Sequence, residues 1–136
     1  MSWLIDTDVL SQPAKPKGDP RVIAWLEAHR DDCYTSTVVL AQLAYWVRVT
    51  EGRRSILQAW LTRLQDAFEG RILSFNTTAA HVWAEQKHRL KQKGISLPVE
   101  DSYIAAIAQR HGLIIVTGND KDFRHCGVKV FNPFKG

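Results

Sequence analysis

The N-terminal stretch Met1-Ser-Trp-Leu-Ile-Asp-Thr-Asp-Val-Leu10 decides the fold that this sequence predicts. Residues 3–5 are a short apolar run of the kind that a buried strand needs, and the run breaks abruptly at Asp6. A strand that ends in carboxylates is typical of a central strand in a parallel sheet, where ligands bind beyond the carboxyl ends. We therefore take Asp6 as the reference point of a candidate site.

Length and composition indicate one globular domain over residues 1–136, with 45% hydrophobic and 24% charged residues. No 18-residue apolar run and no basic-then-apolar leader is present, so we expect no membrane span, no signal peptide and a cytoplasmic location. Cys33 and Cys126 match no metal-binding spacing and are expected to be packed free thiols. The formal charge of +4 mildly favours a polyanionic partner.

Strand-like and helix-like segments alternate along the chain, which predicts a three-layer α/β/α fold around a mainly parallel sheet. After the first strand, further strands are expected at residues 34–36, 71–75, 113–117 and 128–131. Helices are expected at residues 19–30, 36–47, 52–69, 76–93 and 100–111. Residues 11–18 are expected to form a loop, and residues 119–122 a turn.

Polar side chains that can bind metal stand at four places, most of them where a strand ends or a helix begins. These are Asp6, Gln42 within an otherwise apolar helix, Asp101, and the segment Thr117-Gly-Asn-Asp-Lys-Asp122. Strand ends and the helix N-termini that follow them share one edge of a parallel sheet, so the four places are expected to converge. Carboxylates gathered there would repel one another unless a hard cation such as Mg²⁺ or Mn²⁺ joined them.

Each of these signals, taken singly, also has a simpler interpretation. Asp6 and Asp101 could each cap a helix, and residues 119–122 could be only a turn. Gln42 could be a hydrogen-bonded, half-buried amide. Only the combination of the four points to chemistry.

Taken in order, four segments closely resemble the PIN-domain family and, more narrowly, the VapC-type toxins with their FitB-like branch. The segments are Leu4-Ile-Asp-Thr-Asp-Val-Leu-Ser11, Val39-Leu-Ala-Gln-Leu43, Pro98-Val-Glu-Asp-Ser-Tyr-Ile-Ala-Ala106 and Val116-Thr-Gly-Asn-Asp-Lys-Asp-Phe123. The resemblance runs to the closing Val130-Phe-Asn-Pro-Phe134 and covers essentially the whole chain. It implies a PIN-like α/β/α domain and an endoribonuclease toxin that requires Mg²⁺ or Mn²⁺.

The resemblance also implies partners. Such toxins usually form homodimers and are silenced by a cognate VapB-type antitoxin, and operator DNA is bound only through the toxin–antitoxin complex. Family substrates are structured RNAs, and enteric-type members cut the anticodon loop of initiator tRNA. We therefore expect tRNA as the substrate.

The resemblance assigns roles to individual residues of this sequence. The first acid of the family matches Asp6 and its later helix-start acid matches Asp101, and these two are the expected metal ligands. The fourth, variable position of the catalytic set matches Asn119. Further polar groups expected to line the site are Thr7, Ser11, Thr117, Asp120 and Asp122.

The second acid of the family is a Glu, and this sequence has Gln42 in its place. A Gln keeps the shape and hydrogen bonding of a Glu but removes a negative charge beside the metal, so weakened Mg²⁺ binding and low or absent activity are expected. Such an isosteric change is what one would engineer for safe expression of a toxin, and a natural Gln is the alternative. Two other functions stay open: a silent PIN-like module that binds antitoxin and nucleic acid, and a metal-dependent DNA nuclease or phosphatase.

Overall fold

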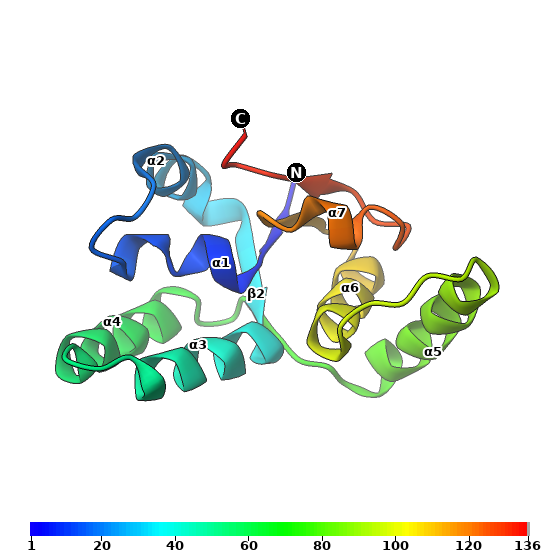
Figure 1. The fold of residues 1–136 in the computed structure, drawn as a ribbon, viewed down its shortest axis with the longest axis horizontal. Coiled ribbons are helices and arrows are strands. Elements are labelled where there is room, and N and C mark those ends of the chain that lie inside the picture. The colour runs from blue at the N-terminus through cyan, green and yellow to red at the C-terminus, as the bar shows by residue number, and fades with distance from the viewer. Residues whose placement is uncertain (136) are drawn as a thin grey trace.

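Five short parallel strands form the middle layer of the protein, seen in a computed structural model that describes residues 1–135 (Figure 1). The strands are β1 (Trp3–Ile5), β2 (Cys33–Ser36), β3 (Ile72–Leu73), β4 (Ile114–Val116) and β5 (Val130–Phe131). Their order in the sheet is β3-β2-β1-β4-β5, and every pairing is parallel. The expected α/β/α class is therefore confirmed.

Helices cover the sheet on both sides, with α1 to α4 on one side and α5 to α7 on the other (Figure 1). The α-helices are α1 (Thr7–Leu10), α2 (Pro20–His29), α3 (Thr37–Val49), α4 (Arg54–Ala67), α5 (Thr77–Gln92), α6 (Val99–His111) and α7 (Asp120–Phe123). Two 3₁₀ turns, Gln12–Ala14 and Arg30–Asp32, complete the chain path.

Helix starts lie where the polar caps of the sequence predict them. The side chains of Asp19, Ser36 and Asn76 each accept a hydrogen bond from a backbone N–H in the first turn of α2, α3 and α5. These bonds satisfy donors that have no partner within the helix, so short polar residues fix where each helix begins. At the other end of α6, Gly112 takes a left-handed conformation with φ +65° and ends the helix.

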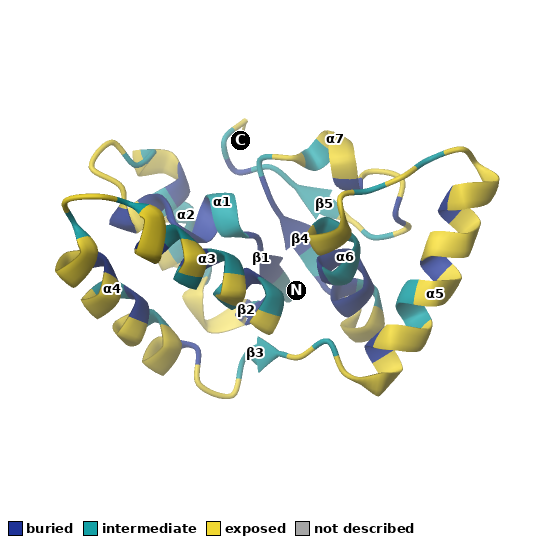
Figure 2. Ribbon diagram, turned by 60° about the horizontal axis from the view of Figure 1, so that its bottom comes forward, coloured by how far each residue is buried: buried dark blue, intermediate teal, exposed yellow. Residues whose placement is uncertain are grey.

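Strand β1 is the central strand, as its sequence predicts. It pairs with β2 through Trp3 and with β4 along its whole length, and Leu4 and Ile5 are fully buried (Figure 2). The chain reaches β2 and β3 on one side of β1 and β4 and β5 on the other. The order of the strands therefore reverses between β1 and β4, and in open α/β sheets the crevice at that reversal is where ligands bind.

Two short helices differ from the expectation of loop and turn. Residues 7–10 form α1, because Asp6 caps it and Val9 and Leu10 turn together into the core, where they are almost fully buried. Residues 120–123 form α7, which places Phe123 in the core with no exposed surface. A single helical turn has too few residues to show a period in the sequence, so burial of its apolar members decides it.

Both cysteines are buried free thiols, as expected. Burial raises the pKa of Cys33 and of Cys126 to about 11. At neutral pH both thiols are protonated, and a protonated thiol is neither a nucleophile nor a metal ligand.

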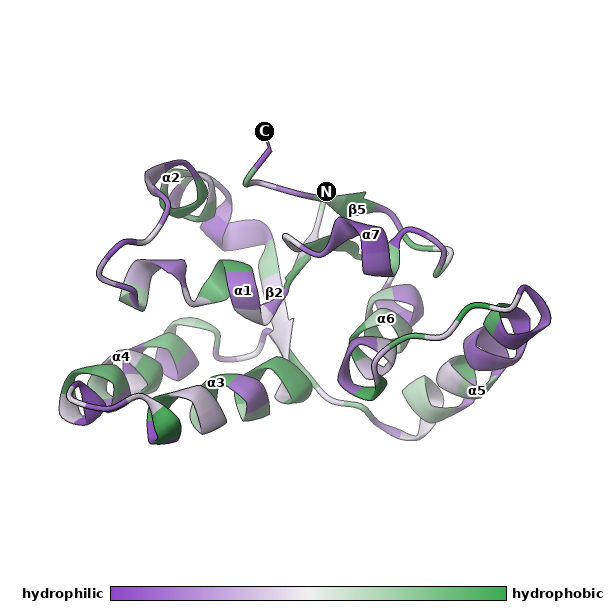
Figure 3. Cartoon of the chain, in the orientation of Figure 1, coloured by the Kyte–Doolittle hydropathy of each residue, from purple (hydrophilic) through white to green (hydrophobic). Residues whose placement is uncertain are grey.

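The outer surface of α5 is strongly hydrophilic toward its C-terminus (Figure 3). Its exposed residues there include Lys87, His88, Arg89 and Lys91. Across residues 1–135, no helix has the length and apolar character that crossing a membrane requires.

Candidate active site

A pocket of about 310 Å³ lies beyond the carboxyl ends of β1 and β4, at the reversal of strand order. It collects residues from α1, α3, α6 and the segment after β4, although these are far apart in the chain. Its lining residues are Asp6, Thr7, Asp8, Ser11, Lys15, Gln42, Trp46, Asp101 and Asn119. Six of the residues expected from the sequence thus meet in one pocket: Asp6, Thr7, Ser11, Gln42, Asp101 and Asn119.

Asp6 is the most buried acid of the pocket, with 4% of its surface exposed. Its Oδ1 accepts a hydrogen bond from the Thr7 N–H, and its Oδ2 accepts one from the Thr117 hydroxyl, each at 2.8 Å. The capping interpretation and the site interpretation therefore both describe Asp6. Thr117 is fully buried and supports Asp6 from inside the protein instead of lining the pocket.

Gln42 is held by hydrogen bonds on both sides of its amide. The Thr7 hydroxyl donates to Gln42 Oε1, and Gln42 Nε2 donates to Glu100 Oε2 at 2.8 Å. The amide therefore links the first turn of α1 to the first turn of α6. Glu100 was not expected at the site, and its position next to Asp101 in the sequence was the one signal for it.

The acids of the pocket raise one another's pKa. Burial, the negative charge of Asp8 and, to a smaller extent, that of Asp101 raise the pKa of Asp6 to about 6. Burial raises the pKa of Asp101 to about 6 as well, and the charges of Asp122, Glu100 and Asp8 add to the effect. Such shifts are typical of functional sites, where like charges are gathered with little water.

Three lining residues were not expected from the sequence. Asp8 stands two positions after Asp6 and its Oδ2 accepts the Gly118 N–H at 2.8 Å. Lys15 comes from the segment expected to be a loop, and Trp46 from a helix whose aromatic residues were expected to serve packing only. Trp46 packs edge-on against Trp60 with ring centroids 6.0 Å apart, so it contributes to packing and to the pocket wall.

Two acids expected near Asn119 lie outside the pocket. Asp120 accepts hydrogen bonds from Asn132 Nδ2 at 3.0 Å and from Lys135 Nζ at 3.3 Å, and these partners lower its pKa. Asp122 is exposed and acts on the pocket only through its charge, which raises the pKa of Asp101. The one-turn helix α7 carries both side chains away from the pocket.

Mg²⁺ or Mn²⁺ fits the chemistry of this donor set. The carboxylates of Asp6, Asp8 and Asp101 line one pocket together with a single lysine, Lys15, and a hard divalent cation offsets their mutual repulsion. Within residues 1–135, no three His, Cys, Asp or Glu side chains are grouped so as to hold an ion by themselves. That arrangement suits Mg²⁺, which binds one or two carboxylates and keeps several waters.

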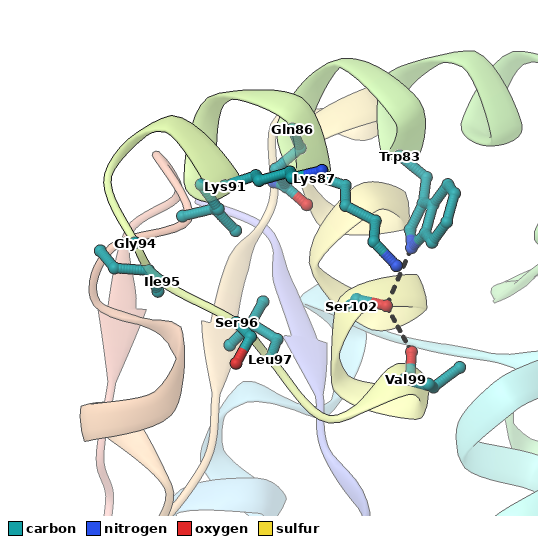
Figure 4. A pocket seen from close by; sticks show the side chains of 11 residues that line it. Trp83, Gln86, Lys87, Lys91, Gly94, Ile95, Ser96, Leu97, Val99 and Ser102 are labelled. Atoms are coloured by element: carbon teal, nitrogen blue, oxygen red, sulfur yellow. Dashed lines mark hydrogen bonds between the residues drawn. The ribbon is translucent and has the colours of Figure 1, made fainter.

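A second cavity, of about 300 Å³, lies between α5, α6 and the segment that joins them (Figure 4). Its wall includes Trp83, Leu90, Ile95 and Leu97, and Trp83 Nε1 donates to the Ser102 hydroxyl at 2.8 Å. No carboxylate lines this cavity, so it lacks the groups that hydrolysis of a phosphodiester needs.

The raised pKa values predict how the metal-free protein responds to pH. The folded protein keeps protons on Asp6 and Asp101 up to about pH 6, whereas the unfolded chain releases them near the ordinary value of 3.8. The folded state binds more protons over this range, so these groups lower stability as pH rises from about 4 to 6. Thermal unfolding in chelator should show this fall, and Asp101→Asn should reduce it.

The difference between the two proteins isolates the Asp101 contribution. His111, whose pKa is lowered by burial, acts in the opposite sense and is common to both. An identical pH dependence of the melting temperature in the two proteins would contradict a raised pKa at Asp101.

The fold and pocket define the class of this protein. The family described as PIN domain matches residues 3–129, and the chain belongs to that family. Within it, the chain is similar to Toxin FitB of Neisseria gonorrhoeae, with 33% identity covering 96% of this chain and 97% of that one. It is also 30% identical to VapC ribonuclease Y4jK of Sinorhizobium fredii, with 97% of each chain covered.

Solved structures agree with these sequence likenesses. The FitAcB crystal structure from Neisseria gonorrhoeae superposes with a TM-score of 0.90 at 33% identity, covering 97% of this chain and 98% of that one. The structure of FitAB bound to an IR36 DNA fragment also gives 0.90, at 31% identity, covering 97% and 95%. The expected resemblance to VapC-type toxins and their FitB-like branch is thereby confirmed.

Proposed function

We propose that this chain is the endoribonuclease toxin of a VapBC-type toxin–antitoxin pair, with activity weakened by Gln42. One observation carries the proposal: Asp6, Asp101, Asn119 and Gln42 line a single pocket at the strand-order reversal of a PIN domain. Relatives of similar length that are named VapC ribonucleases support the reaction class.

In this proposal Asp6 and Asp101 hold Mg²⁺ or Mn²⁺. When bound, the ion supplies an activated water and neutralises charge that develops on the phosphate. The protein's own part is to fix the donors: Thr7 N–H and Thr117 orient Asp6, and the first turn of α6 presents Asp101. Asn119, Ser11 and Asp8 complete the polar wall.

The substrate in this proposal is tRNA, with the anticodon loop of initiator tRNA as the first candidate. An open pocket with an exposed Lys15 and a half-buried Trp46 at its wall suits single-stranded RNA. Lysine contacts phosphate, and an indole ring stacks on a splayed base. A loop of unpaired nucleotides presents both groups, unlike a closed duplex.

Partners and location follow from the same family. FitAB and FitAcB are complexes, and FitAB is bound to DNA. We propose that this chain likewise forms a homodimer in the cytoplasm, binds a cognate VapB-type antitoxin, and meets operator DNA only through that complex. The net charge of +4 suits binding both to RNA and to an acidic antitoxin segment.

The direct test incubates the purified chain with a total tRNA pool, with Mg²⁺ in one arm and chelator in the other. Slow cleavage at discrete sites is expected with Mg²⁺ and none in chelator, because the two acids cannot activate water without an ion. Cleavage that persists in chelator would show that a contaminating or metal-independent nuclease is responsible.

A second function is favoured by the contacts of Gln42. Its amide is engaged by Thr7 on one side and Glu100 on the other, an arrangement that a structural linker would also show. In that case the chain binds antitoxin and nucleic acid without cutting. Absence of cleavage in Mg²⁺ together with retention of tRNA on the protein would establish this function instead.

A further inference from the structure

We infer that Asp8 supplies the third negative charge of the divalent-cation site, the charge that Gln42 does not carry. The inference rests on the proposed function, since it assigns one more residue to the same pocket. Asp8 lines that pocket with Asp6 and Asp101, two positions after Asp6 and in the first turn of α1.

The two oxygens of Asp8 have very different surroundings. Oδ2 accepts the Gly118 N–H at 2.8 Å. Oδ1 is shielded from solvent, and no group within residues 1–135 forms a hydrogen bond with it. A shielded carboxylate oxygen without a donor is strongly disfavoured, so Oδ1 requires either a cation or a proton. A cation is the partner that this acid-lined pocket is built to receive.

The fold holds this carboxylate in place. A Cβ added at Gly118 would lie 2.6 Å from Asp8 Oδ2 and 3.0 Å from the Phe134 ring, so only glycine lets the loop after β4 approach so closely. The loop in turn supplies the N–H that orients the carboxylate. Metal ligands in proteins are characteristically fixed in this way by a hydrogen bond to the oxygen that does not face the ion.

Gln42 cannot supply the missing charge. Its amide is neutral, and both of its polar atoms are engaged, Oε1 by Thr7 and Nε2 by Glu100. Lys15, the cation that lines the pocket, does not satisfy Asp8 Oδ1 either. Asp8 is therefore the acid in the pocket that is available to take the place of the family Glu.

The test measures Mn²⁺ binding to the full-length chain by the electron paramagnetic resonance signal of free Mn²⁺. Asp8→Asn keeps the shape and the acceptor for the Gly118 N–H but removes the charge. We expect it to weaken Mn²⁺ binding by about tenfold or more, because affinity for such ions depends on the number of charged ligands. Asp120→Asn is the matched control, since it removes an acid outside the pocket, and it should leave the affinity within about twofold.

The outcomes separate this inference from the proposed function. An Asn is isosteric with a protonated Asp, so unchanged binding by Asp8→Asn would mean that Oδ1 carries a proton and would overturn the inference. Asp101→Asn is the reference for the site itself: if it binds Mn²⁺ as the unmodified chain does, the proposed metal site fails as well. Should Asp8→Asn not fold, judged by thermal unfolding in chelator, Asp8→Ser makes the same comparison.

Discussion

Replacing Gln42 by Glu is expected to raise the rate of Mg²⁺-dependent tRNA cleavage by on the order of 10- to 100-fold. The new carboxylate would lie in the pocket with Asp6 and Asp101 and strengthen its hold on the ion. The measurement is the single-turnover rate on total tRNA, followed by growth arrest when the variant is expressed without an antitoxin.

The structure adds a condition to this prediction. Gln42 Nε2 lies 2.8 Å from Glu100 Oε2, so a Glu at position 42 would place two carboxylates in contact. Their repulsion favours a proton on one of them and reduces the gain. We therefore expect the double variant Gln42→Glu, Glu100→Gln to cleave faster than Gln42→Glu alone, because the new amide can donate to the new carboxylate.

Glu100→Gln alone completes the double-mutant cycle. The two substitutions are expected to be non-additive, since the side chains are in direct contact. Equal cleavage rates in all four proteins would show that position 42 does not act on the metal site, and that Asp6 and Asp101 suffice without it.

Replacing Asp101 by Asn is expected to lower Mg²⁺-dependent cleavage by roughly 100-fold or more, in the unmodified chain and in the Gln42→Glu background. Asp101 is half-buried in the first turn of α6 and is one of the two proposed ligands. Its loss leaves a neutral amide where the ion needs charge. The measurement is the same single-turnover assay, with Mg²⁺ varied so that weaker binding and slower chemistry can be told apart.

Asp120→Asn is the matched control for this loss. Asp120 was expected from the sequence to line the site, but its carboxylate pairs with Asn132 and Lys135 outside the pocket. An exposed pair of this kind contributes little to stability, so cleavage should stay within about twofold. If both variants lost activity equally, the effect would come from the net charge of this end of the sheet and not from a metal ligand.

Much of the architecture could be predicted because local patterns carry it. The apolar run at residues 3–5 and the β-branched run at 114–116 are strands because their side chains pack on both faces of the sheet. Asp19, Ser36 and Asn76 cap helices because the first backbone N–H groups have no other partner.

The meeting of Asp6, Gln42, Asp101 and Asn119 in one pocket also followed from the sequence. It needs only the rule that the carboxyl ends of parallel strands and the N-termini of the following helices share one edge. The individual role of each residue in the reaction remains a prediction, since that role depends on chemistry and not on placement.

Tertiary structure alone decided which polar groups face each other within that pocket. The link from Gln42 to Glu100 joins residues 58 positions apart, and the bond from Gly118 to Asp8 joins residues 110 positions apart. No local period encodes such contacts, because they depend on how α1, α3, α6 and the loop after β4 pack around the sheet. The sequence therefore determined where the pocket is, and packing determined that Asp8 lines it while Asp120 does not.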